Sequence, residues 1–141
     1  MPTRPRGHRT VPHTADVIVE AWAPDLASCL EEAAAALVGI CADTGRAAEV
    51  ERRPVRLAPA PPEALLLDLL EEVIFALDTA GAVPARAEVT STPDGGLDVV
   101  LVLVDPAAVR ATGSVPKAVS RSGLEVRVEP RRVDGRFLVD V

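Results

Sequence analysis

The chain has 141 residues, a length typical of a single domain that can bury a hydrophobic core of its own. Apolar residues make up 48% of the chain and charged residues 26%, which is typical of folded globular proteins and excludes a disordered chain. The net charge is -6 and only 2% of the residues are aromatic. This composition disfavours direct nucleic-acid binding, which uses clustered cations for phosphates and aromatic faces for bases.

Cysteine and hydropathy patterns indicate a cytoplasmic protein without a membrane segment. Cys29 and Cys41 are expected in one helix, about 18 Å apart at ~1.5 Å per residue, which is too far for a disulfide. The longest apolar stretch, Ala33 to Ala42, is much shorter than the ~20 residues of a spanning helix. The basic, proline-rich residues 1–10 are expected to form a disordered tail, followed by one domain over residues 11–141.

The first half of the domain predicts strands and helices in alternation. Period-two alternation predicts a strand over Val17 to Trp22, and Asp25 is a suitable N-cap for a helix over residues 26–41. A second strand is expected around Val50 to Leu57, with Pro54 restricting it to an edge or a bulge. The helix that follows, over residues 63–78 and including Phe75, is so apolar that we expect it to be covered on more than one side.

The second half predicts antiparallel strands. The segments Ala85–Thr92 and Leu97–Val104 flank the turn residues 93–96 and predict a hairpin. Alternation predicts a strand around Leu124 to Val128, a turn at Asp134-Gly135 and a last strand over Phe137 to Val141. This order predicts an α+β fold in which two main helices pack against antiparallel or mixed β-sheets.

Candidate functional residues lie at the ends of predicted strands. Asp16, Asp140 and the terminal carboxylate of Val141 are hard oxygen donors of the kind that Ca²⁺ and Mg²⁺ accept, and Lys117 is the only lysine in the chain. Zinc is not expected, because the chain has no CxxC or HExxH motif and His13 has no paired histidine. Each residue also has a structural interpretation: Asp16 as a turn cap, Asp140 as a solvent-facing strand end, and Lys117 as a solvated loop cation.

Five segments stand out in this order along the chain: His13-Thr14-Ala15-Asp16, the helix with Leu30-Glu31-Glu32-Ala33 through Cys41-Ala42-Asp43, the helix from Leu65 to Asp78, Lys117-Ala118-Val119, and the ending Leu138-Val139-Asp140-Val141. Taken together, these segments resemble the archease family over about residues 11–141. The chain departs from the family pattern after Val119, where Ser120-Arg121-Ser122 replaces the Thr-Tyr that members often have.

The resemblance implies an accessory protein, not an enzyme, that activates an RtcB-type RNA ligase in tRNA splicing and RNA repair. Family members are understood to promote guanylylation of the ligase and its multiple turnover. The resemblance therefore implies that this protein acts on RNA only indirectly, through the ligase. By position, Asp16, Asp140 and Val141 would hold a divalent cation, Ca²⁺ in the first place with Mg²⁺ or Mn²⁺ as alternatives. Lys117, His13 and Asp43 would belong to the same functional surface. An acidic, aromatic-poor monomer would suit docking on a basic, RNA-binding enzyme.

Two other functions stay open from the residues. A small metal-dependent hydrolase or phosphotransferase could use Asp16 and Asp140 directly, although His13 is the only visible general base and no phosphate-binding loop is present. A chaperone-like binding module could use the acidic surface and the apolar helix for several clients.

Overall fold

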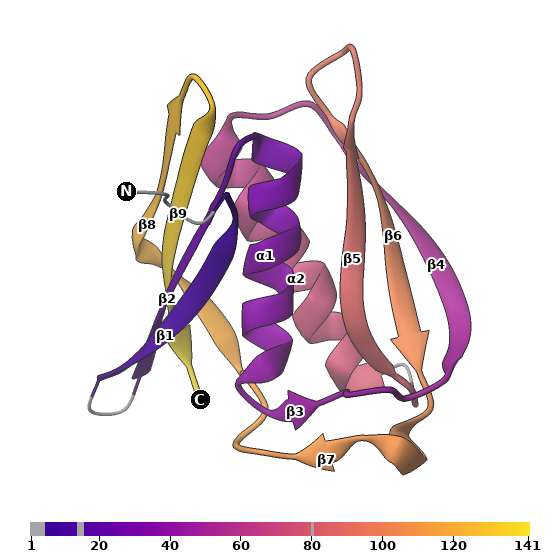
Figure 1. The fold of residues 1–141 in the computed structure, drawn as a ribbon. Coiled ribbons are helices and arrows are strands. Elements are labelled where there is room, and N and C mark those ends of the chain that lie inside the picture. The colour runs from indigo at the N-terminus through magenta and orange to yellow at the C-terminus, as the bar shows by residue number, and fades with distance from the viewer. Residues whose placement is uncertain (1–4, 14–15, 80) are drawn as a thin grey trace.

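Two helices lie between two antiparallel β-sheets in the computed structural model, which describes residues 5–13, 16–79 and 81–141 (Figure 1). The elements are β1 (Gly7–His13), β2 (Asp16–Ala23), α1 (Leu26–Gly39), β3 (Ala42–Asp43), β4 (Glu49–Leu57), α2 (Pro62–Thr79), β5 (Val83–Ser91), β6 (Leu97–Val104), the 3₁₀ helix η1 (Pro106–Ala108), β7 (Arg110–Ala111), β8 (Ala118–Glu129) and β9 (Arg132–Asp140). One sheet has the order β1-β2-β9-β8, a second has the order β4-β6-β5, and β3 pairs with β7. The α+β fold predicted from the sequence is thus confirmed.

Helix α1 begins and packs as its sequence predicts. The Asp25 side chain accepts a hydrogen bond of 2.8 Å from the Ser28 backbone N–H, which satisfies one of the free donors of the first turn. The buried residues of α1 include Leu30, Ala33 and Leu37, each at most 1% exposed. The helix ends at Gly39, so Cys41 follows the helix instead of lying in it.

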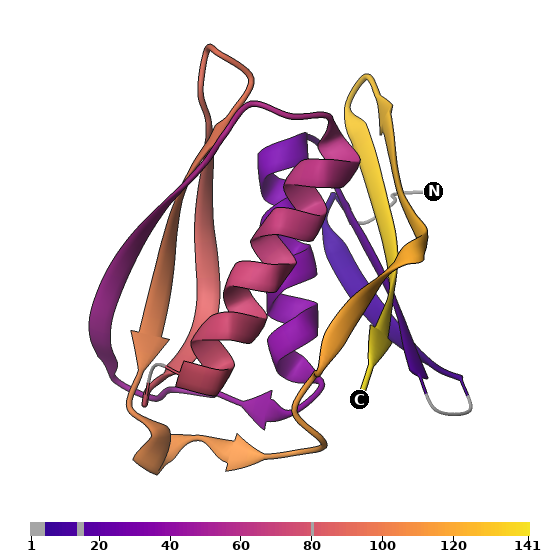
Figure 2. The same cartoon turned by 180° about the vertical axis from the view of Figure 1, so that it is seen from behind.

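Helix α2 is buried on more than one side, as expected, but Phe75 is not part of the buried surface. The buried residues of α2 are Leu65, Leu66, Leu67, Leu69, Leu70, Val73, Ile74 and Ala76. Phe75 is 63% exposed. Figure 2 shows the physical reason: α2 covers α1 from one side and leaves its own outer face open between β4 and β8. Within the described part of the chain, neither helix is long and apolar enough to cross a membrane.

The predicted hairpin and the predicted edge strand are both present. Strands β5 and β6 pair in antiparallel fashion across residues 92–96, where the Thr92 backbone N–H donates to the Gly96 carbonyl at 3.0 Å. Strand β4 lies at the edge of the β4-β6-β5 sheet. Pro54, which cannot donate a backbone hydrogen bond, lies in this edge strand.

The prediction of a turn at Asp134-Gly135 is wrong, because both residues lie inside β9. The chain reverses between β8 and β9 near Arg131, whose φ is 65°. Gly135 is buried, and a Cβ placed on it would lie 3.7 Å from the Cys29 Sγ. A Cβ at this distance would make an ordinary van der Waals contact, so Gly135 is an inward-facing position of β9 and does not reverse the chain.

The domain starts earlier than predicted, because Gly7 to His13 form strand β1 and only residues 1–4 of the proposed tail lie outside the described residues. The Arg6 guanidinium binds Glu32, and the His8 Nδ1 lies 2.8 Å from the same carboxylate. Burial of this carboxylate opposes its ionisation, but the hydrogen bonds from His8 and Arg6 prevail and lower the pKa of Glu32. Glu31 accepts a hydrogen bond of 2.8 Å from the Val89 N–H of β5, so α1 connects the two sheets.

Both cysteines are free and buried, as predicted. Burial of the Cys29 thiol raises its pKa from 9.0 to about 11, and nearby carboxylates, Asp134 first among them, add to the effect. Burial also raises the pKa of Cys41. Low thiolate content and restricted access make both residues structural rather than reactive.

We expect the free energy of unfolding to fall as the pH rises from about 9 to 11. In this range the unfolded chain releases a thiol proton that the folded chain still holds. The contribution of Cys29 to the free energy of unfolding is therefore fully present below pH 9 and is lost as the pH rises through the pKa of Cys29 in the folded chain. The chain has no tyrosine and one lysine, so few other groups titrate in this window. Urea unfolding at pH 7.5, 9 and 10.5 measures the effect. In Cys29→Ala the free energy of unfolding should fall less steeply with pH. An equally steep fall in this variant would contradict the assignment of the effect to the Cys29 thiol.

Candidate functional site

The pairing of four strands brings three of the predicted site residues into one row. Asp16 of β2 is the register partner of Asp140 of β9, and His13 of β1 is the register partner of Asp16. On the other side, Ala118 of β8 is the partner of Asp140. Residues that are more than one hundred positions apart in the sequence thus become direct neighbours in the β1-β2-β9-β8 sheet.

Asp16 and Asp140 lie on the face of the sheet that points away from the helices. Their chain neighbours Val17 and Val139 are partners too, and Val139 is fully buried, whereas Asp140 is exposed and Asp16 half-buried. Residues directly opposite in an antiparallel pair have Cα atoms about 4.5–5.5 Å apart and side chains on one face. The two carboxylates therefore face solvent side by side.

Lys117 adjoins this row through its backbone. The Lys117 N–H donates a hydrogen bond of 2.8 Å to the Asp140 carbonyl, and its side chain is exposed. The preceding Pro116 is buried, which holds the backbone at this point. Among the ion pairs of the described residues, none includes Lys117, Asp16 or Asp140.

Asp43 is placed in a different environment, on the short β3–β7 sheet. Its carboxylate lies 3.1 Å from the Arg110 guanidinium and also accepts a hydrogen bond of 3.0 Å from the Gly45 N–H. These contacts give Asp43 a structural role at the turn after β3.

The donor chemistry of the Asp16–Asp140 pair suits a hard divalent cation. Two carboxylates held opposite each other repel, and a bound cation removes this repulsion. Within the described residues no group of three or more histidine, cysteine, aspartate or glutamate side chains is arranged to hold a metal. Further oxygen ligands would have to come from Val141, which follows Asp140 directly, and from water and backbone carbonyls.

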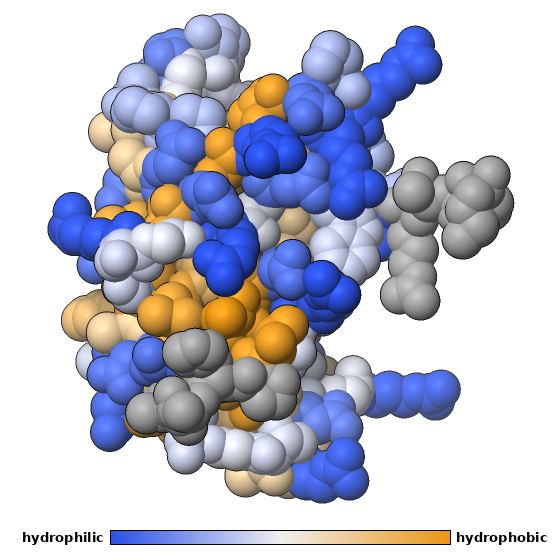
Figure 3. Space-filling view, turned by 90° about the vertical axis from the view of Figure 1, so that its left-hand side faces the viewer, coloured by the Kyte–Doolittle hydropathy of each residue, from blue (hydrophilic) through white to orange (hydrophobic). Residues whose placement is uncertain are grey.

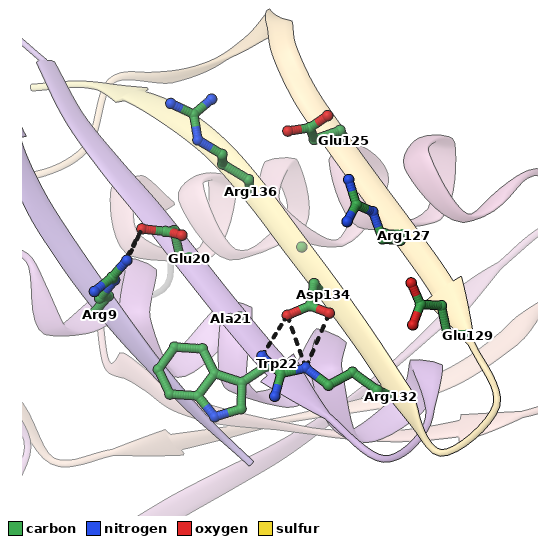
Figure 4. Close-up of a pocket in the computed structure, with 11 residues that line it drawn as sticks. Arg9, Glu20, Ala21, Trp22, Glu125, Arg127, Glu129, Arg132, Asp134 and Arg136 are labelled. Atoms are coloured by element: carbon green, nitrogen blue, oxygen red, sulfur yellow. Dashed lines mark hydrogen bonds and ion pairs between the residues drawn. The ribbon is translucent and has the colours of Figure 1, made fainter. Parts of the chain in front are cut away.

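The same sheet face carries a hollow of about 650 Å³ that the sequence did not predict (Figure 4). It is lined by Arg9, Glu20, Ala21, Trp22, Glu125, Arg127, Glu129, Arg132, Asp134, Gly135 and Arg136. Arg9 binds Glu20 at 2.9 Å and Arg132 binds Asp134 at 2.8 Å. The residues alternate in charge across four strands, so only the strand register could have revealed this grouping.

An apolar row separates the hollow from the carboxylate pair. Val11, Ile18 and Leu138 are register partners on β1, β2 and β9. Figure 3 shows this side of the molecule, where an apolar area lies among hydrophilic side chains. Glu20 is four residues from Asp16 on the same strand, which places the hollow about 14 Å from the carboxylate pair at ~3.4 Å per residue.

The segment at which the chain departs from the expected family pattern forms an irregularity of β8. The register between β8 and β9 shifts between Ser120 and Glu125, and Gly123 has a φ of 78°. Arg121 and Ser122 are exposed there. The departure therefore changes a surface bulge and leaves the pairing of Ala118 with Asp140 unaltered.

Comparison with protein families gives a match to the Archease protein family over residues 8–141. The chain belongs to the archease family. Curated relatives agree: two proteins named "Probable protein archease", from two strains of Mycobacterium tuberculosis, are each 42% identical over 118 residues. The aligned part is 84% of this chain and 65% of each relative, so the chain spans about two thirds of their length.

Solved structures show the same fold. The solution structure of Methanobacterium thermoautotrophicum protein 1598 superposes with a TM-score of 0.75 at 24% identity, covering 96% of this chain and 99% of that one. A crystal structure of "an archease, possible chaperone" from Thermotoga maritima has a TM-score of 0.67 at 18% identity, covering 94% and 96%. The overall fold is thus common to this chain and these two solved structures.

Proposed function

We propose that the chain is an accessory protein that activates an RtcB-type RNA ligase in tRNA splicing and RNA repair, acting in the cytoplasm as a monomer. The observation that supports this best is the row in which Asp16 and Asp140 lie opposite each other. The Lys117 backbone N–H donates a hydrogen bond to the Asp140 carbonyl in this row. These are the residues that the family resemblance assigns to function. The chain would not join RNA itself but would promote guanylylation of the ligase and its repeated turnover.

The proposal includes a divalent cation, Ca²⁺ before Mg²⁺ or Mn²⁺, held by Asp16, Asp140 and Val141. When bound, it would supply positive charge on the outer face of the sheet, at the end of β2 and β9. Strand pairing holds the backbones of Asp16 and Asp140 opposite each other, so the chain presents both carboxylates on one face of the sheet. Lys117, whose backbone is hydrogen-bonded to Asp140, adds an exposed cationic side chain, and together these groups would meet the phosphate-bearing site of the ligase.

Multiple-turnover ligation tests the proposal. The cognate RtcB-type ligase is used at substoichiometric amounts with GTP and Mn²⁺, with and without this protein. We expect several products per ligase molecule in its presence and about one in its absence, and Lys117→Ala should reduce the stimulation. Because the Lys117 side chain is exposed, this variant should keep the wild-type melting temperature.

Absence of stimulation with a ligase that is active in a single turnover would contradict the proposal. Protection of an unrelated unfolding protein, unaffected by Asp16→Asn, would then favour the chaperone-like function. Phosphoester hydrolysis that is lost in Asp16→Asn would favour the metal-dependent hydrolase.

A further inference from the structure

Helix α2 leaves one stripe of side chains to solvent. Asp68, Glu71, Phe75 and Asp78 recur at intervals of three or four residues and are all exposed, and Glu72 beside them is half-buried. These five residues are called the α2 stripe. Figure 2 shows α2 on the open side of the molecule, flanked by β4 and β8, each of which is an edge strand of its sheet.

Part of the α2 stripe lines a hollow between the helix and the end of β4. This hollow measures about 500 Å³, and its lining residues are Arg56, Leu57, Ala58, Asp68, Glu71, Glu72 and Phe75. Phe75 is 63% exposed, whereas the leucines of α2 that pack on α1 and the sheets are mostly below 10%. An exposed aromatic ring beside a hollow is a typical anchor point of protein interfaces.

The charge around Phe75 is negative and uncompensated. Within the described residues, none of the ion pairs includes Asp68, Glu71, Glu72 or Asp78. Among the described residues that line the hollow, Arg56 is the only cation, and it is already bound to Asp94 at 2.7 Å and to Asp98 at 3.0 Å. Furthermore, the sequence has no lysine or arginine between Arg56 and Arg86.

This arrangement works against the stability of α2 itself. Asp68 and Glu72 are like charges at i and i+4, a spacing that destabilises a helix by about 0.2–0.5 kcal/mol. Asp78 lies in the last turn, where the helix dipole favours cations, and no basic residue is present there. Local rules that are broken without a structural gain are typical of a binding surface.

We propose that the α2 stripe is the docking surface for a basic segment of the partner protein. An apolar or arginine side chain of that segment packs on the Phe75 ring in the hollow, and further lysine or arginine residues pair with Asp68, Glu71 and Glu72. The identity of the partner as the RtcB-type ligase rests on the proposed function. Docking by α2 leaves the Asp16–Asp140 row free to act separately, because this row lies on the outer face of the β1-β2-β9-β8 sheet.

Binding of the active ligase to immobilised full-length protein, measured as Kd and association rate at two salt concentrations, tests this inference. We expect Phe75→Ala and Glu71→Arg each to raise Kd at least about tenfold, since truncation of an interface anchor has effects of this size. Glu71→Arg should act mainly on the association rate and more strongly at low salt. Matched controls are Val50→Ala, with Val50 56% exposed, and Glu125→Arg on the outer sheet face; both should bind within about twofold of wild type.

The outcomes separate this inference from the proposed function. If wild type binds and stimulates the ligase but Phe75→Ala and Glu71→Arg bind equally well, the α2 stripe is not the docking surface and the proposed function stands. If wild type neither binds nor stimulates an active ligase, the proposed function fails. The docking inference is then decided by an NMR titration with a peptide of alternating arginine and leucine. Shifts confined to residues 68–78 and lost in Glu71→Arg support it, whereas dispersed or absent shifts overturn it.

Discussion

Asp16→Asn should remove the stimulation of ligation, down to the rate of the ligase alone, without lowering the melting temperature. The carboxylate of Asp16 lies directly opposite that of Asp140, so the neutral amide removes a repulsion that costs about 0.2–1 kcal/mol. Stability should therefore stay equal or rise slightly. Function should be lost, because an amide is a much weaker ligand for a hard cation than a carboxylate.

A calcium titration gives this prediction a second measurement that does not depend on the ligase. Ca²⁺ should raise the melting temperature of the wild type and have little effect on Asp16→Asn, because a ligand stabilises the folded chain only where it binds. Asp134→Asn is the matched control, since Asp134 lies on the same sheet face but is bound to Arg132. This control should keep the stimulation within about twofold. Full stimulation by Asp16→Asn would contradict a functional role for the carboxylate pair.

Phe137→Ala should destabilise the fold more than Cys29→Ala, Val50→Ala, Phe75→Ala or Leu138→Ala. Phe137 is 1% exposed and is the largest fully buried side chain. Its truncation removes apolar burial and leaves a cavity, which costs about 3–5 kcal/mol and lowers the melting temperature by about 10–20 °C. Urea unfolding monitored by circular dichroism measures the loss.

Leu138→Ala is the control for Phe137→Ala and also tests the register of β9. Leu138 is half-buried on the outer face of the same strand, so its truncation should cost less than half as much. A slip of one residue would exchange the two faces of the strand. A larger loss for Leu138→Ala than for Phe137→Ala would therefore contradict the register that places Asp140 opposite Asp16.

The elements that the sequence predicted correctly are those with a strong local signal. Asp25 marks the start of α1 by a side-chain hydrogen bond within one turn, and residues 93–96 mark the hairpin between β5 and β6. Pro54 correctly indicated an edge strand, because its missing N–H is a property of the residue itself. In each case the physical cause lies within a few residues of the chain.

The incorrect element predictions concern residues whose structure depends on distant partners. Gly7 to His13 have little alternation of their own and form a strand through pairing with β2 and the contacts of His8 with α1. Gly135 resembles a turn glycine in sequence but lies in β9, where it packs close to Cys29. Phe75 continues an apolar pattern, yet the position of α2 between two sheet edges leaves it exposed.

The sequence by itself determined the fold class, the two helices, the central hairpin and the identity of the candidate residues, because these follow from local patterns and from motif resemblance. Only the tertiary structure decided which of these residues are neighbours. Strand register places Asp16 opposite Asp140 and brings Asp43 into an ion pair with Arg110. Helix packing leaves the α2 stripe exposed to solvent. Contacts of this kind join residues far apart in the chain, and no periodicity within a single segment encodes them.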